Sequence, residues 1–111
     1  MLKLRYRHEF DAVFDRARKI KSGFLTVLML QNDLGMPRLG MVIAKRYVRT
    51  ATKRNRLKRL IRAAFRHQVE QIGSYDLVVM AQKLITDYPQ AVWGDEVKRT
   101  MVTVSEKLIK K

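Results

Sequence analysis

Residues 45–66, KRYVRTATKRNRLKRLIRAAFR, combine a helical apolar period with an unbroken run of positive charge. The segment holds ten basic side chains and no acidic one, and the acid-free run extends from Leu34 to Val69. A surface helix that needs only solubility interleaves charges of both signs, because like charges at i,i+4 destabilise it. The segment therefore predicts a partner that supplies negative charge, and the commonest biological polyanion is a nucleic acid backbone.

The apolar residues of this segment predict an amphipathic helix with one buried face. From Thr52 onward they recur at steps of three and four, at Leu57, Leu60, Ile61, Ala64, Phe65, Val69 and Ile72. The hydroxyl of Thr50 or Thr52 can cap the first turn, and Gly73 is placed to end the helix. The apolar face is narrow, which suits a protein core better than a lipid surface. The basic side chains are then held on the opposite face of a rigid element.

Composition predicts a single folded domain over residues 1–111. The chain has 24 Lys plus Arg against 10 Asp plus Glu, a net charge of +14, yet 47% of its residues are hydrophobic. The absence of cysteine excludes disulfide scaffolds and thiol catalysis. No run of about eighteen apolar residues occurs, and the first ten residues lack the apolar core of a signal peptide. We therefore expect a cytoplasmic protein without a membrane partner.

The other segments predict an α+β fold. The predicted elements are a helix over Tyr6–Arg18, strands over Phe24–Leu30 and Arg38–Ala44, the basic helix, a strand over Asp76–Ala81 and a helix from Ala91. The turn residues at 31–37 predict that the first two strands form a hairpin. The basic helix between two strands makes a βαβ unit, for which a right-handed crossover is the general rule. The expected architecture is a compact α-β-β-α-β-α sandwich, with helices on a small mixed sheet.

Few residues suggest chemistry on the protein itself. His8 and His67 are far apart and lack a second ligand at metal spacing. The acidic residues are scattered, whereas protein nucleases need clustered carboxylates or a positioned acid and base. We expect no catalytic and no metal-binding side chain. Trp93 is expected to pack in the core. Phe10 and Phe14 alone are also typical of a core, although aromatics beside a basic groove can stack single-stranded bases.

Several motifs, taken in order, resemble the bacterial ribonuclease P protein family. Residues 53–66, KRNRLKRLIRAAFR, resemble its RNR signature. Residues 38–46, RLGMVIAKR, are similar to the family's R-[hydrophobic]-G-x-x-x-[small]-[basic]-[basic] strand that precedes the signature. Phe10 and Phe14 match the paired aromatics of its first helix, and residues 76–83 resemble its third strand. An RNR triplet alone is a weak signal, but this ordered set covers nearly the whole chain.

The resemblance implies a function that the periodicities do not show. It implies an α/β sandwich with a left-handed βαβ crossover, acting as the protein subunit of the endonuclease that removes the 5′ leader from precursor tRNA. Catalysis and Mg²⁺ would belong to the RNA subunit, and no obligatory protein partner is expected. The implied RNA-subunit contacts are Lys45, Arg46, Lys53, Arg54, Asn55, Arg56, Lys58, Arg59 and Arg62. The implied leader contacts, in a groove between the first helix and the sheet, are Phe10, Phe14, Val27 and Lys83.

Two departures from the family pattern and two alternative functions complete the prediction. Relatives can carry an aromatic residue near Val27, and a second basic residue is common where Gln82 precedes Lys83.

A structural ribosomal or rRNA-binding protein would share the size and charge of this chain. A DNA-binding regulator would instead be expected to dimerise and to prefer duplexes. The RNA that copurifies with the chain distinguishes the ribonuclease P hypothesis from the ribosomal one.

Overall fold

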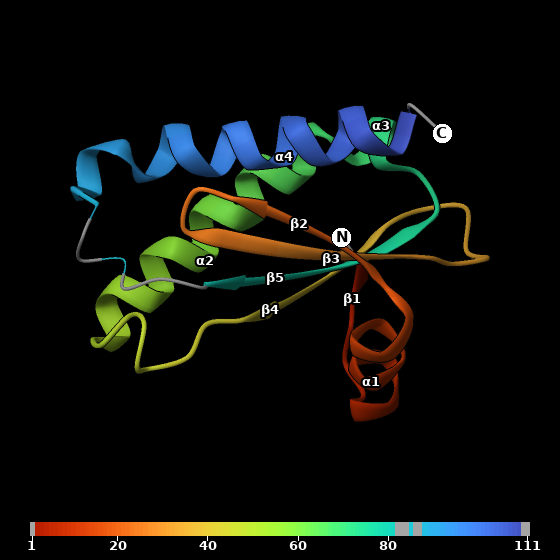
Figure 1. The fold of residues 1–111 in the computed structure, drawn as a ribbon, viewed down its shortest axis with the longest axis horizontal. Helices are drawn as coiled ribbons and strands as arrows, with labels where there is room; N and C mark the ends of the chain where they lie inside the picture. The colour runs from red at the N-terminus through yellow and green to blue at the C-terminus, as the bar shows by residue number, and fades with distance from the viewer. Residues whose placement is uncertain (1, 82–84, 86–87, 110–111) are drawn as a thin grey trace.

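The computed structural model describes residues 2–81, 85 and 88–109 (Figure 1). Its elements are, in order, β1 (Leu2–Lys3), α1 (Arg7–Arg16), β2 (Arg18–Ser22), β3 (Leu25–Gln31), β4 (Arg38–Val42), α2 (Ala51–His67), α3 (Val69–Ile72), β5 (Tyr75–Ala81), the 3-10 helix η2 (Gln90–Val92) and α4 (Trp93–Ile109). No helix in these described stretches has both the length and the apolar character needed to cross a bilayer.

The strands form one mixed sheet in the order β1-β4-β5-β3-β2. β4 and β5 are parallel neighbours, with Arg38 opposite Asp76, and α2 connects them, so the predicted βαβ unit is confirmed. β5 and β3 are antiparallel, as are β3 and β2. The predicted α+β class, with helices on a small mixed sheet, is therefore confirmed.

The predicted hairpin between residues 24–30 and 38–44 is wrong. β5 lies between β3 and β4, and Val79 at its centre is opposite Val27 on one side and Met41 on the other. β5 is apolar on both faces, which suits a central strand, and both faces are buried in the structure. The turn residues at 31–37 carry no information about this. The hairpin partner of β3 is β2, joined through Gly23 at φ 60°. The first helix accordingly ends at Arg16, two residues before its predicted end, and Arg18 begins β2.

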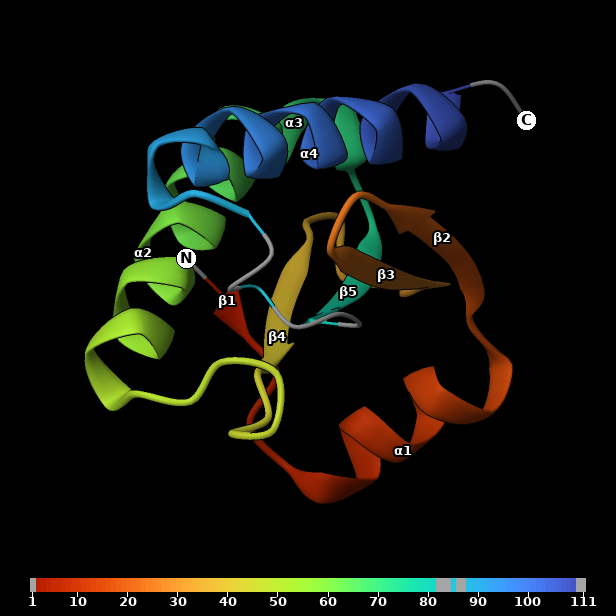
Figure 2. The same cartoon turned by 60° about the vertical axis from the view of Figure 1, so that its left-hand side comes forward.

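Helices cover both faces of the sheet. In Figures 1 and 2, α2, α3 and α4 lie on one face and α1 lies on the other. The larger core fills the α2/α4 side, and its largest fully buried side chain is Trp93, 1% exposed, whose Nε1 donates to the Tyr88 carbonyl at 3.0 Å. The predicted packing role of Trp93 is confirmed. A smaller cluster of Leu4, Val13, Leu28 and Val78 lies under α1.

The basic helix begins as predicted but ends earlier. Thr50 is its N-cap, and the Thr50 hydroxyl oxygen accepts from the backbone N–H of Lys53 at 3.2 Å. The predicted apolar face is buried, at Leu57, Ile61, Ala64 and Phe65. Gln68 leaves the helical region at φ −114° and ψ 9°, so the short α3 completes the path to Gly73, which has φ 70°. The rigid part of the basic helix is therefore Ala51–His67.

Candidate nucleic-acid interface

The basic side chains of α2 lie on the side of the helix that is not packed in the core. Asn55, Arg56 and Arg59 are exposed, and Lys53, Arg54, Lys58 and Arg62 are half-buried. The first turn of α2 contains no acidic residue, so nothing on the helix offsets the positive end of its dipole. This end of the helix therefore attracts anions such as phosphate, because it combines backbone N–H groups, the positive end of the dipole and fixed cations.

The loop before α2, residues 43–50, carries Lys45 and Arg46 and is anchored to the fold. Val48 is fully buried, and the Arg46 guanidinium lies 4.9 Å from the centre of the Tyr47 ring. Arg54 Nη1 donates to the carbonyl oxygens of Val48 and Arg49 at 2.9 and 3.1 Å. One nitrogen of this predicted RNA contact is therefore used to hold the loop that presents the other cations.

A hollow of about 200 Å³ joins the basic helix to the first helix. We call it the edge hollow, and it is lined by Lys3, Leu4, Phe10, Leu39, Gly40, Met41, Lys58 and Arg62. It brings Phe10, a predicted leader contact, to the same surface as Lys58 and Arg62, two predicted RNA-subunit contacts. Lys3 is a further cation at this place, and sequence reasoning missed it because β1 is only two residues long.

Phe10 is seated on the backbone of β4. A Cβ placed on Gly40 would lie 2.6 Å from Phe10 Cε1, so a side chain at this position would displace the ring. Phe14 lies one helical turn further along α1, with its ring centre 6.5 Å from that of Phe10, and it is 50% exposed. The two aromatics therefore follow each other along α1, the first packed against the sheet and the second open to a ligand.

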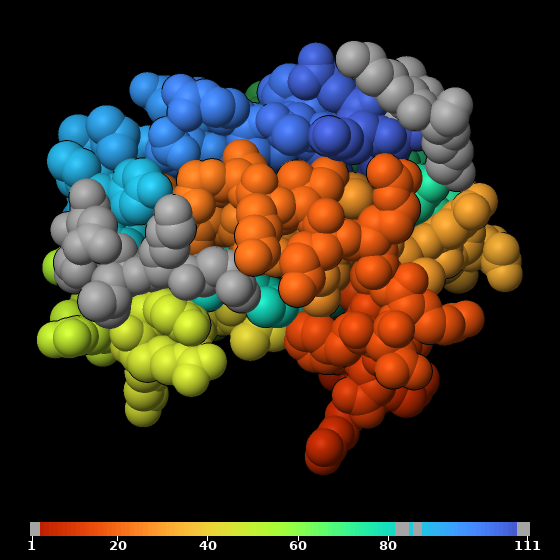
Figure 3. Space-filling view, viewed as in Figure 1, coloured from red at the N-terminus to blue at the C-terminus, as the bar shows by residue number. Residues whose placement is uncertain are grey.

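Beside α1 the sheet leaves part of its face open. Val42, Met80 and Thr26 are paired neighbours across β4, β5 and β3 on the α1 face. Val42 is 40% exposed, Met80 is half-buried and Thr26 is buried. Figure 3 shows a hollow here, between α1 in red and the loop of residues 43–50 in yellow-green. We call this space, which lies between α1 and that loop beside Val42, Met80 and Thr26, the sheet groove.

One of the four predicted leader contacts, Val27, faces away from the groove. Val27 is 0% exposed and belongs to the core on the α2/α4 side, so its assignment as a leader contact is wrong. Successive residues of a strand point to opposite faces, and this alternation puts its neighbours Thr26 and Leu28 on the α1 side instead. Lys83 lies outside the described residues.

A partly buried charge network fixes α1 on the sheet. Arg38 Nη1 lies 2.5 Å from Glu9 Oε2, and Arg38 Nη2 lies 2.7 Å from Asp76 Oδ2. Arg38 Nε also donates to Asp76 Oδ1 at 2.8 Å. Glu9 Oε1 accepts the backbone N–H groups of Arg5 and Tyr6 at 2.7 and 2.9 Å. The network thus ties the start of α1 to β4 and β5, and so fixes the wall of the groove.

The same contacts shift two ionisation equilibria. Backbone hydrogen bonds from Tyr6 and Arg5, with a smaller part from Arg38, lower the pKa of Glu9 from 4.5 to about 2. The hydrogen bonds and charge of Asp76, followed by those of Glu9, raise the pKa of Arg38 above its usual range. Both groups therefore stay charged across the neutral range.

The lowered pKa of Glu9 predicts a pH-dependent stability. The contribution of ionised Glu9 is fully present above the unfolded-state pKa near 4.5 and is lost as the pH falls toward the folded-state value of about 2. Urea unfolding of the wild type and of Glu9→Gln, followed from about pH 6 down to about pH 2, should show a stability difference that shrinks over this window. A difference that stays constant with pH would contradict the role given to the ionised carboxylate.

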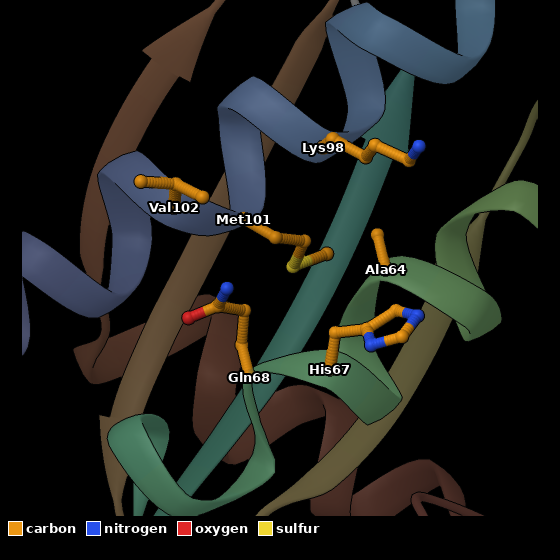
Figure 4. A pocket seen from close by; sticks show the side chains of 6 residues that line it. All are labelled: Ala64, His67, Gln68, Lys98, Met101 and Val102. Atoms are coloured by element: carbon orange, nitrogen blue, oxygen red, sulfur yellow. The ribbon is translucent and has the colours of Figure 1, made fainter.

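A second hollow, of about 230 Å³, lies on the other side of the sheet between α2 and α4 (Figure 4). It is lined by Ala64, His67, Gln68, Lys98, Met101 and Val102, with Met101 reaching toward α2 in Figure 4. None of the predicted RNA contacts that the structure describes lines it. Within the described ranges, no three His, Cys, Asp or Glu residues are placed to share a metal ion.

Known proteins resemble this chain in sequence. The family model described as Ribonuclease P matches residues 1–105. The ribonuclease P protein component of Pseudomonas aeruginosa is 47% identical over 76 residues, which are 68% of this chain and 56% of the relative. The corresponding protein of Methylococcus capsulatus is 43% identical over 84 residues, 76% of this chain and 66% of the relative. The match to the first relative thus spans little more than half of its length.

Solved structures show the same architecture. The RNase P protein of Staphylococcus aureus superposes with a TM-score of 0.81 over 96% of both chains at 19% identity, a likeness of fold alone. The RNase P protein of Thermotoga maritima gives a TM-score of 0.64 over 98% of this chain and 93% of that one, at 27% identity. The sheet order and the helix on each face described above are therefore an arrangement that these proteins share.

Proposed function

The chain belongs to the ribonuclease P protein family, and from this we propose that it is the protein subunit of a cytoplasmic ribonucleoprotein that removes the 5′ leader of precursor tRNA. In this proposal α2 and the loop of residues 43–50 bind the RNA subunit, and the sheet groove holds the leader. The basic side chains neutralise phosphates that would otherwise repel each other when two RNAs are brought together.

The edge hollow is the observation that best supports this proposal. Its walls come from α1, β1, β4 and α2, so one surface combines the aromatic Phe10 with the cations Lys58 and Arg62. A single strand leaving an RNA bound at α2 would meet Phe10 first and then Phe14 along α1. Aromatic side chains that follow one another beside fixed cations are the usual means of holding single-stranded RNA without a strict sequence preference.

The chemistry is assigned to the RNA subunit. The described residues include no cluster of carboxylates or imidazoles, whereas Mg²⁺ prefers several oxygen ligands in a near-octahedral arrangement. We propose that the catalytic Mg²⁺ ions are held by RNA phosphates, and that this chain raises the affinity of the complex for precursor tRNA and for those ions by lowering the net negative charge around them.

Copurification and reconstitution test the function. A tagged chain isolated from cells is expected to carry one predominant RNA species, and recovery of whole ribosomal subunits would favour the ribosomal alternative. The purified chain, freed of nucleic acid, is expected to leave precursor tRNA intact, and to restore cleavage when it is added to the RNA subunit at low Mg²⁺. Cleavage by the chain alone, or no restoration, would overturn the proposal.

Replacement of Phe14 tests the groove. Phe14→Ala is expected to weaken binding of precursor tRNA to the reconstituted complex by roughly tenfold, because one base-stacking contact of about 1–2 kcal/mol is lost. Binding of mature tRNA, which has no leader, should not change. Val102→Ala is a matched control, because Val102 is an apolar side chain 43% exposed on α4, beyond the opposite face of the sheet. Equal losses for precursor and mature tRNA would remove Phe14 from the leader path.

A further inference from the structure

β2 forms a second basic edge, on the side of the sheet farthest from β1. Arg16, at the end of α1, and Arg18, Lys19 and Lys21 of β2 are all exposed. Residues 16–32 contain no acidic side chain, and none of these four cations forms an ion pair with any residue that the structure describes. This positive charge is as uncompensated as that of α2, and the contacts assigned so far do not use it.

The register of β2 divides its cations between the two faces of the sheet. Lys19 is opposite Leu28 and Lys21 is opposite Thr26, and both partners face α1. Ile20 packs against the core of the other face, and Ser22 Oγ lies 3.1 Å from Thr100 Oγ1 of α4. Because side chains alternate along a strand, Lys19 and Lys21 belong to the α1 face, and Arg18 belongs to the α4 face.

Lys21 continues the row of residues that forms the sheet groove. The row runs Val42, Met80, Thr26, Lys21 across β4, β5, β3 and β2. It crosses three strand spacings, roughly 14 Å in all, and the ten residues of α1 beside it span about 15 Å. α1 starts near β4, where Phe10 lies on Gly40, and it leads directly into β2. The groove therefore begins at the edge hollow and ends at Lys21 and Lys19.

Two further observations point to a ligand at this end. Thr26, next to Lys21 in the row, is 1% exposed, and its hydroxyl has no hydrogen-bond partner among the described residues, although a buried hydroxyl normally has one. In Figure 3 the side chains of β2 and β3, in orange, form the front rim directly above the hollow beside α1. A polar strand leaving the groove would pass both Thr26 and the two ammonium groups.

We propose that Lys19 and Lys21 bind phosphates of the distal part of the leader, the part that has crossed the sheet groove and lies farthest from the tRNA. This inference rests on the proposed function and extends it, because it makes the affinity depend on leader length. A leader too short to cross the three strand spacings stacks on Phe10 and Phe14 without reaching β2. A longer leader adds two phosphate contacts at the far edge.

Leader-length dependence in the assembled complex tests the inference. The full chain carrying Lys19→Gln and Lys21→Gln is combined with the RNA subunit, and dissociation constants are measured over a salt series for two precursors. One precursor has a leader too short to cross the sheet, and the other has a leader several times longer. For the long leader we expect a loss of roughly 20-fold at ~0.1 M salt and a log–log salt slope shallower by about 1.4, the value for two phosphates on a single strand. Binding of the short leader should stay unchanged.

Two variants serve as controls. Arg18→Gln removes one charge from the same strand on the opposite face, and is expected to leave the preference for the long leader intact. Lys19→Arg with Lys21→Arg keeps both charges and should retain the wild-type slope. Thermal unfolding of the free chains checks that all variants fold.

The outcomes separate this inference from the function on which it rests. A wild-type complex that binds long and short leaders equally would overturn the leader groove and this inference together. A wild type that prefers the long leader, and a double Gln variant that keeps that preference in full, would overturn the inference alone. The two lysines would then serve only to block pairing of the exposed edge strand with another chain. Equal losses for both leaders, or the same loss in Arg18→Gln, would likewise overturn it.

Discussion

A chain carrying both Arg56→Ala and Arg59→Ala is expected to bind the RNA subunit roughly 60-fold more weakly at ~0.1 M salt, the size of two lost contacts to duplex phosphates at a slope of about 0.9 each. Both side chains are exposed on α2, and neither forms an ion pair or a side-chain hydrogen bond with another described residue. Their positions, three residues apart, put them on the same face of the helix, away from the buried Leu57 and Ile61.

The measurement is a filter-binding titration over a salt series at low Mg²⁺. The log–log slope should become shallower by about 1.8, while the free energy of unfolding in urea stays within about 0.5 kcal/mol of the wild type. Lys98→Ala with Lys107→Ala is the matched control, because these two exposed cations are on α4 and neither is a predicted RNA contact. An equal loss in the control would show that net charge, and not the surface of α2, governs binding.

Arg38→Met is expected to lower the free energy of unfolding by about 3–5 kcal/mol, because it removes the one positive charge that both Glu9 and Asp76 contact. The side chain of Glu9 is 14% exposed and that of Asp76 is 6% exposed, so solvent replaces the lost guanidinium poorly. Methionine retains most of the length of the side chain, and the loss therefore reports on charge and hydrogen bonding. Such a loss is a large share of the 5–15 kcal/mol typical of a small domain.

Urea unfolding at neutral pH measures this effect. Arg99→Met is the control, because Arg99 forms an ion pair with Glu96 at 2.6 Å but is 66% exposed, and its loss should cost less than about 1 kcal/mol. Adding Glu9→Gln and Asp76→Asn to Arg38→Met should recover part of the stability, since no uncompensated charge then remains. If Arg38→Met and Arg99→Met cost the same, the network does not hold α1 on the sheet.

Local sequence predicted the elements of this fold better than their arrangement. The apolar period of α2, a threonine cap at its start and the burial of Trp93 depend on residues a few positions apart, and all were confirmed; of the two threonines predicted as caps, the structure uses Thr50. β2 was missed because a strand of five residues with one apolar side chain has almost no periodic signal. The hairpin was wrong because pairing depends on which strand is buried on both faces, and that is a property of the whole sheet.

The candidate site divides in the same way. Charge sign and helix face belong to the sequence itself, so the exposed Arg56 and Arg59 could be predicted from the printed residues. The path of the groove could not be predicted, because the pleat of a strand in its final register decided that Thr26 faces α1 while Val27 faces the core. The meeting of Phe10 with Lys58 and Arg62 was likewise decided only by tertiary structure. Phe10 and these two cations are nearly fifty residues apart in the sequence, so they come together only when the sheet has assembled.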